Sequence, residues 1–86
     1  MVETWNYVAG DLRGVGLMLA EALRAAAGTR VRVAPLELSI ASKLGLWLRG
    51  ETEDVKTVRE RLEKALDERK IEWHALRWTE NRARGG

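Results

Sequence analysis

Residues 36–48 read LELSIASKLGLWL, and every leucine and isoleucine in this stretch stands at an even position. A two-residue period is typical of a strand with one buried face, because successive side chains of a strand point to opposite sides. The break at residues 41–43, ASK, separates two such apolar sets and predicts that the chain folds back as a hairpin. A lone hairpin is only marginally stable in water, so the remaining residues are expected to cover its leucine face.

Before the hairpin, the sequence predicts one strand and one helix. Residues 3–9 are rich in strand-forming side chains and stop at Gly10-Asp11. Residues 15–27, VGLMLAEALRAAA, are rich in alanine and leucine and predict a helix that ends at Gly28. This helix has only about one charged residue per turn, so most of its surface is apolar. Two interpretations are open. Either the small alanines tolerate water, or the helix is buried twice, on its own sheet and on a partner protein.

The start of the next strand is out of phase with the hairpin leucines. Val31 and Val33 stand at odd positions, whereas the leucines that follow stand at even positions. Pro35 lies between the two sets, and proline within a strand is found mainly at edges and bulges. We therefore expect a bulge or a register shift at Pro35.

The last helix is the clearest one, and the point where it ends decides the fold. Thr52 suits a helix N-cap, and apolar residues recur at helical spacing as far as Leu66. Either the helix ends near Lys70 and residues 71–78 form a fourth strand, or the helix continues through that segment. Residues 52–79 contain no glycine, proline or asparagine to make a turn, which favours the long helix.

The expected fold is an α+β domain, an antiparallel sheet with two helices on one face. Its element order is β-α-β-β-α, with the ferredoxin-like β-α-β-β-α-β as the alternative. Residues 1–80 are expected to form this single domain, and residues 81–86 a flexible basic tail. Either order leaves the second face of the sheet open.

The open face is the first candidate for a functional surface. The side chains expected there are Trp5, Tyr7, Arg32, Trp47 and Arg49. Aromatic rings beside arginines suit two kinds of partner. A dimer joined through its sheets would cover them, and so would single-stranded RNA with its bases stacked on the rings.

The composition excludes several classes of function. The chain has no cysteine, so it has no disulfide, thiolate metal site or thiol nucleophile. His74 is the single histidine and lacks a second ligand for a metal, and Ser39 and Ser42 have no obvious base beside them. We therefore expect no enzymatic activity, no metal and no other cofactor.

No apolar run is long enough to span a bilayer and no export signal is visible, so we expect a soluble cytoplasmic protein without membrane contact. The absence of glutamine, with abundant glutamate and arginine, indicates a thermophilic source.

The loop before the first helix resembles part of the acylphosphatase signature. Val8, Gly10 and residues 14–16, GVG, match its valine, its glycine and the run that opens the helix. The phosphate-binding arginine of that family would fall at Met18, however, and no asparagine follows in the second strand. The resemblance therefore implies, at most, a catalytically inactive acylphosphatase-like domain.

Taken together, the elements resemble the small dimerising subunit of the KEOPS tRNA-modification complex, the CTAG/Pcc family. The resemblance covers roughly residues 2–70 and lies in the layout of the chain. A strand is followed by a helix with Ala20-Glu21-Ala22-Leu23, then by the hairpin, and then by an acidic turn that opens a helix with Val58-Arg59. Where the family has an asparagine one turn later, this chain has Leu62-Glu63-Lys64, so a divergent paralogue fits best.

This resemblance implies a non-catalytic scaffolding subunit. Family members pair through their sheets, with themselves or a paralogue. They pack their helices on the larger catalytic subunit that makes threonylcarbamoyladenosine in tRNA. The implied contacts with that subunit are Leu19, Ala22, Leu23, Ala26, Arg59 and Leu62. Arg77, Arg82 and Arg84, in the basic C-terminal part of the chain, would then contact tRNA phosphates.

Overall fold

The computed structural model describes residues 1–37 and 44–78 of the chain. In sequence order the elements are β1 (Val2–Ala9), α1 (Leu12–Ala26), β2 (Arg32–Glu37), β3 (Leu44–Glu51), α2 (Thr52–Glu68) and β4 (Trp73–Trp78). The turn expected at residues 41–43 and the tail expected at residues 81–86 lie outside the described residues.

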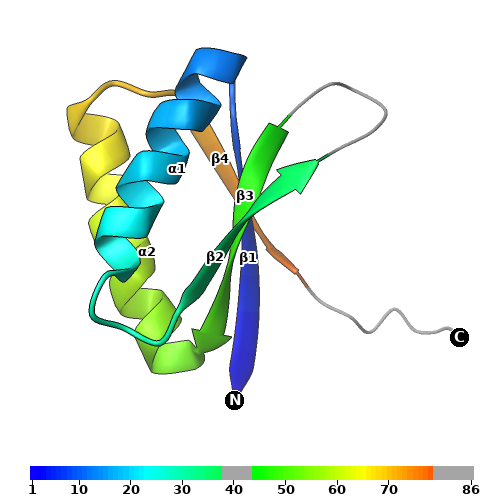
Figure 1. Ribbon diagram of the computed structural model, residues 1–86, viewed down its shortest axis with the longest axis vertical. Coiled ribbons are helices and arrows are strands. Elements are labelled where there is room, and N and C mark those ends of the chain that lie inside the picture. Colours follow the sequence, from blue (N-terminus) through cyan, green and yellow to red (C-terminus); the bar gives the residue numbers. More distant parts are fainter. Residues whose placement is uncertain (38–43, 79–86) are drawn as a thin grey trace, which may run out of the picture.

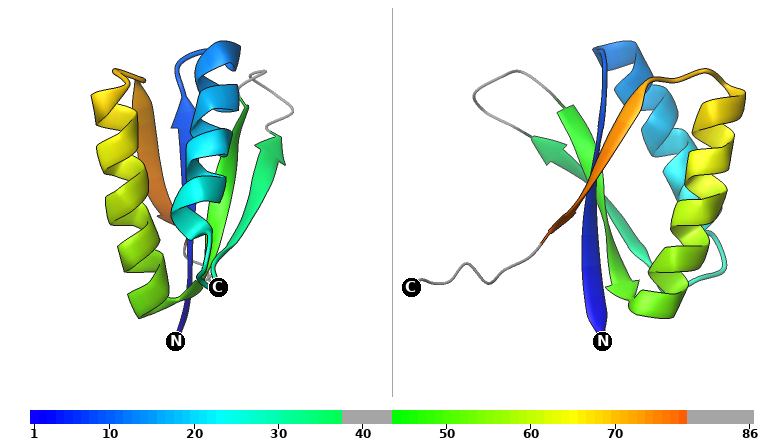
Figure 2. Two further views of the ribbon diagram at one scale, coloured as in Figure 1. Left: turned by 60° about the vertical axis from the view of Figure 1, so that its left-hand side comes forward. Right: turned by 180° about the vertical axis from the view of Figure 1, so that it is seen from behind.

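The strands form one four-stranded antiparallel sheet in the order β2-β3-β1-β4, and both helices lie on the same face of it (Figures 1 and 2). The predicted α+β fold class is confirmed. The element order is the ferredoxin-like β-α-β-β-α-β, which the sequence left as the alternative. In the parts of the chain that the structure describes, no helix has the length and apolar character needed to cross a membrane.

The prediction of a long second helix is wrong, because α2 ends at Glu68. Lys70 has a φ of 58°, the left-handed conformation that glycine usually supplies after a helix. The N–H of Lys70 donates to the carbonyl of Asp67 at 3.1 Å, and the N–H of Ile71 donates to the carbonyl of Leu66 at 2.9 Å. These two bonds form a Schellman motif, and the chain then continues into β4.

The core lies between the helices and the middle strands. Leu46 and Leu48 of β3 are fully buried on the helix side, as the even-position pattern predicted. They share one apolar cluster with side chains of both helices, chiefly Met18, Ala22, Val55, Val58, Leu62 and Leu66. Full burial of one such side chain contributes about 1.5–3 kcal/mol, so the β3 leucines are a large part of what holds the two layers together.

β2 joins β3 without the bulge expected at Pro35. The pairing of Arg32–Glu37 with β3 runs through the proline with no inserted residue. β2 is an edge strand, where the missing N–H of a proline is tolerated. Even positions of β2 therefore stand opposite odd positions of β3, so Arg32 and Ala34 do not share the face of Leu46 and Leu48. Val31 and Val33 pack against the core instead.

α1 begins at Leu12, three residues earlier than expected. The carboxylate of Asp11 caps it by accepting from the N–H of Gly14 at 2.7 Å. Glu21, in the middle of the helix, points inward: it is buried, and its carboxylate lies 2.5 Å from Nε of Arg69 at the end of α2. Since this charge faces the other helix, the outer side of α1 is more apolar than its sequence suggests.

Candidate functional site

Trp5 and Tyr7 lie on the face of the sheet that the helices cover, so the prediction that they occupy the open face is wrong. Tyr7 is fully buried, and its ring centroid is 5.8 Å from that of Trp73 in β4. Trp5 packs at the margin of the same core. The two rings bury more apolar surface than Thr4 and Asn6 would in the opposite orientation of β1. The buried hydroxyl of Tyr7 finds its partners on α2.

Those partners are Arg59 and Glu63, one turn apart on α2. The hydroxyl of Tyr7 donates to Oε2 of Glu63 at 2.5 Å and accepts from Nε of Arg59 at 2.9 Å. The Arg59 guanidinium also binds Oε2 of Glu63 at 2.9 Å and lies 3.4 Å from the centre of the Trp5 ring. Burial, and then the hydrogen bond to Glu63, raise the pKa of Tyr7 well above its ordinary value. This cluster ties β1 to α2 and therefore has a structural role.

The open face is made by alternate positions of all four strands. Its middle row, from β2 to β4, consists of Ala34, Trp47, Asn6 and Leu76. The row on one side begins with Arg32 opposite Arg49, and the row on the other side ends with Val8 opposite His74. Among the side chains that the structure describes, Trp47 is the single aromatic ring on this face. It is half-buried, with short neighbours on both sides of its row.

The charges of the open face are positive along these rows. Arg32 and Arg49 are both exposed, and within residues 1–37 and 44–78 neither of them forms an ion pair. Glu51, at the end of β3, is already paired with the N-terminal ammonium at 2.8 Å. Like charges directly opposite each other destabilise a sheet, so an anion bound over the two arginines would relieve their repulsion.

The structure thus brings Arg32, Trp47 and Arg49 together on one face, as predicted. Sequence reasoning misses His74 and Leu76, because it continues the second helix through them. Leu76 is 70% exposed on this face. The isoleucine and tryptophans of residues 71–78 are the sequence signal that favours a strand there.

Most of the residues expected to contact a catalytic subunit lie inside the domain. Ala22, Ala26 and Leu62 are buried in the core, so a partner cannot reach them in this fold, and Leu19 is partly buried against the core. Arg59 is held in the cluster between β1 and α2.

Leu23 differs from the other predicted contacts because it is exposed on α1. It is 55% exposed, and Leu12 and Leu17 are 66% and 39% exposed. Leu12 and Leu23 lie about 20° apart around the helix axis, and we call these two side chains the apolar side of α1; Leu17 lies about 120° from Leu23, beyond Arg24. No described residue covers them, so a partner protein on this helix stays a prediction.

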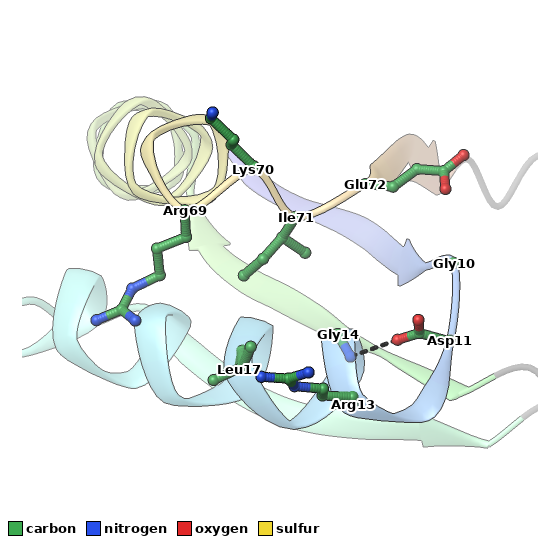
Figure 3. A pocket seen from close by; sticks show the side chains of 9 residues that line it. All are labelled: Gly10, Asp11, Arg13, Gly14, Leu17, Arg69, Lys70, Ile71 and Glu72. Atoms are coloured by element: carbon green, nitrogen blue, oxygen red, sulfur yellow. Dashed lines mark hydrogen bonds between the residues drawn. The ribbon is translucent and has the colours of Figure 1, made fainter.

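A cleft of about 360 Å³ opens between the start of α1 and the turn after α2 (Figure 3). It is lined by Gly10, Asp11, Arg13, Gly14, Leu17, Arg69, Lys70, Ile71 and Glu72. Three lining side chains are positive, Arg13, Arg69 and Lys70, and two are carboxylates, Asp11 and Glu72. Arg69 is already paired with Glu21. Asp11 also occupies the N–H of Gly14, which an anion at the helix N-terminus would need. The cleft therefore lacks the features of a phosphate cradle.

The remaining candidates for binding phosphate are not gathered into a site. Met18, which stands where the acylphosphatase arginine would fall, is fully buried and offers no ligand. Arg77 in β4 lies 3.5 Å from the carboxylate of Glu3. Arg82 and Arg84 lie outside the described residues.

Comparison with known proteins supports the fold and leaves the function open. No protein-family model matches the sequence, and no curated protein sequence matches it. A solved structure with the same arrangement is the de novo designed protein Foldit4, with a TM-score of 0.61 and 13% identity over 93% of this chain and 97% of that chain. At this identity the likeness shows the fold alone, so a function must be argued from the surfaces of this chain.

Proposed function

We propose that the chain is a binding module that holds single-stranded RNA on the open face of its sheet and catalyses no reaction itself. The observation that carries this proposal is the placement of Trp47 beside two opposed arginines, Arg32 and Arg49, on a face without a helix cover. A base can stack on the indole while the guanidinium groups meet the phosphates on either side of it.

The charge of the open face favours a polyanion over a face-to-face dimer. In such a dimer, each copy would bring Arg32 and Arg49 to the same interface. The carboxylate in the described rows of the face is Glu51, and it is already paired with the N-terminal ammonium. An RNA strand neutralises these groups instead, and its stacked base covers apolar surface at Trp47 and Leu76.

The test is a titration of labelled single-stranded RNA with the protein, followed by fluorescence anisotropy at several salt concentrations. Trp47→Ala should weaken binding by about tenfold, the lower part of the range for one stacked base, and Trp47→Phe should largely restore it. Each phosphate contact adds about −0.7 to the slope of log K against log salt for a single strand. Arg49→Ala should therefore make that slope shallower by about 0.7.

Arg13→Ala is the matched control, because it removes the same charge from α1 on the other side of the molecule. It should leave the affinity almost unchanged. Equal losses for Arg13→Ala and Arg49→Ala would mean that binding follows net charge and that the open face is not the site. Absence of binding at low salt would refute the proposal outright.

A second role follows from the helix layer. We propose that the apolar side of α1 docks a larger catalytic subunit of an RNA-modification complex, as the KEOPS-like resemblance implies. The supporting observation is the exposure of Leu12 and Leu23 on one side of the helix. Since α1 and the open face lie on opposite sides of the sheet, one chain could hold tRNA and the catalytic subunit together (Figure 2).

The docking role is tested by affinity purification of the tagged chain from its native source. Leu23→Glu should remove an RNA-modifying enzyme from the purified complex, while Lys56→Glu on the outside of α2 and Trp47→Ala on the sheet should not. If Leu23→Glu folds and retains the enzyme, the proposed contact through α1 is wrong.

A further inference from the structure

β4 is an edge strand whose outer side has no partner among the described residues. The opposite edge, β2, contains Pro35, and proline blocks the pairing of an edge with another strand. β4 has the sequence WHALRW, with no proline or glycine and with a tryptophan, a strong strand former, at each end. The two edges of the sheet therefore differ: one is protected and the other is able to pair.

The backbone groups that β4 presents at its free edge follow from its pairing with β1. The N–H of Gly10 donates to the carbonyl of Glu72 at 3.3 Å, so Glu72 directs its backbone groups toward β1. In an antiparallel ladder, hydrogen-bonded and non-hydrogen-bonded positions alternate. His74 and Leu76 therefore also direct their N–H and C=O toward β1. Residues 73, 75 and 77 direct theirs outward.

From this alternation we infer that a second copy of the chain pairs antiparallel with β4 along its free edge, with Ala75 of each copy opposite Ala75 of the other. This register joins all three outward-facing positions, because 73 then meets 77 of the second copy. Each hydrogen-bonded pair exchanges two bonds, so the three pairs supply about six bonds between the copies. If the register shifts by two residues, one of the three outward-facing residues of each β4 has no hydrogen-bonding partner in the β4 of the second copy.

Side-chain chemistry supports the same register. On the helix side, Trp73 stands opposite Arg77 of the second copy, a pairing that allows a cation–π contact. The indole N–H of Trp73 already donates to the carboxylate of Asp67 at 2.9 Å, so the incoming guanidinium also meets a negative charge. On the open side, Leu76 stands opposite His74 of the second copy, which covers a leucine that is 70% exposed in the single chain.

This pairing goes beyond the proposed RNA role and does not depend on it. It joins the sheets of both copies into one continuous sheet, and places both open faces on the same side. The contact is an edge contact of one strand from each copy, so we expect a reversible dimer whose population rises with concentration.

The first test is sedimentation equilibrium of the full chain, without RNA, over a wide concentration range. The wild type should show a monomer–dimer equilibrium, and a monomer at every concentration would overturn the inference. Ala75→Pro removes an N–H that points to the free edge, so it should raise the dimer dissociation constant by about tenfold without breaking the β1–β4 ladder. Unchanged dimerisation of a folded Ala75→Pro variant would also overturn it.

A second test reads the register and does not depend on the proline variant. The chain has no cysteine of its own, so single cysteines report contacts without background. His74→Cys and Leu76→Cys change exposed side chains that stand opposite each other in the proposed dimer. Directly opposed, non-hydrogen-bonded positions lie about 4.5 Å apart between Cα atoms, which suits a disulfide.

The expected result is a disulfide-linked dimer when the His74→Cys and Leu76→Cys proteins are mixed and oxidised. Each variant alone should link to itself far less, because identical positions are diagonal in this register. Linkage within the His74→Cys sample alone, or within the Leu76→Cys sample alone, would indicate a shifted register and overturn the inference. Absence of linkage in the mixture would overturn it as well.

Discussion

Arg32 and Arg49 lie directly opposite each other on neighbouring strands, on the face of the sheet that the helices leave bare. A folded protein gains nothing from two like charges in such a pair, because directly opposed like charges destabilise a sheet. A conflict of this kind between local energetics and the fold is typical of a functional site. The repulsion between Arg32 and Arg49 should therefore be visible in measurements of stability.

We predict that Arg32→Glu stabilises the free protein and weakens RNA binding at the same time. Replacing repulsion by attraction across the strands should raise the free energy of unfolding by about 0.5 kcal/mol at low salt, and less at high salt. The RNA affinity should fall several-fold because a phosphate contact is replaced by a repulsive charge. Urea unfolding and RNA titration on the same samples measure both effects.

Arg30→Glu is the matched control for this substitution, since Arg30 is exposed just before β2 begins. It makes the same charge change without altering the opposed pair. If it stabilised the protein as much as Arg32→Glu, the gain would come from net charge, and the cross-strand repulsion would not be its cause.

The Tyr7 cluster predicts how stability depends on pH. The pKa of Tyr7 in the folded protein is raised above its ordinary value of 10.0, first by burial and then by Glu63. The folded state therefore favours the neutral phenol. Its contribution is fully present below about pH 10, the unfolded value, and is lost as the pH rises toward the folded pKa. Urea unfolding at a series of alkaline pH values should show stability falling above about pH 10.

Tyr7→Phe isolates this contribution. It should cost about 1–2 kcal/mol at neutral pH, because Arg59 and Glu63 lose a shared partner. It should also make the alkaline loss of stability shallower than in the wild type. Tyr7 is the single tyrosine of the chain, so phenolate absorbance follows its titration directly. Ionisation of the folded protein near pH 10 would contradict the buried, hydrogen-bonded environment.

Gly45 is predicted to be indispensable in β3. A Cβ added there would lie 2.1 Å from the backbone oxygen of Tyr7, and a backbone atom in the middle of the sheet cannot move away cheaply. Gly45→Ala should therefore lower the free energy of unfolding by about 3 kcal/mol. Gly16→Ala is the matched control: Gly16 lies in α1 with nothing within 4 Å of the added Cβ, so it should stabilise by about 0.5–1 kcal/mol. Thermal unfolding of both variants gives the comparison, and a tolerated Gly45→Ala would argue against the β1–β3 register.

Much of the fold could be predicted because apolar periodicity dictates it. The alternate leucines of β3 and the spacing of apolar residues in α2 each fix which side chains are buried. The orientation of β1 could not be predicted in the same way. Its two sets of alternate residues are both partly polar, and the choice depends on partners for the Tyr7 hydroxyl that lie more than fifty residues away.

A residue of the candidate site could be predicted only where the sequence shows which side chains of its strand face the core. Trp47 and Arg49 follow from the alternate leucines of β3, and Arg32 follows from the valines on either side of it, Val31 and Val33. The favoured long second helix misses Leu76 and His74, because the end of α2 depends on Lys70 adopting a conformation that sequence rules assign to glycine. No pattern in the sequence marks a lysine for that position.

The turn at Lys70 leads to the last prediction. A non-glycine residue in the left-handed conformation costs roughly 1–2 kcal/mol, because its Cβ approaches the following carbonyl. Lys70→Gly should relieve this and raise the free energy of unfolding by about 1 kcal/mol, with the α2-to-β4 turn unchanged. Gly28, after α1, has a φ of 81°, which is also left-handed. Gly28→Ala should therefore lower the free energy of unfolding by a similar amount, because it places a Cβ in that conformation. If Lys70→Gly instead destabilised the protein in urea unfolding, Lys70 would not hold the left-handed position, and the Schellman motif that ends α2 would be wrong.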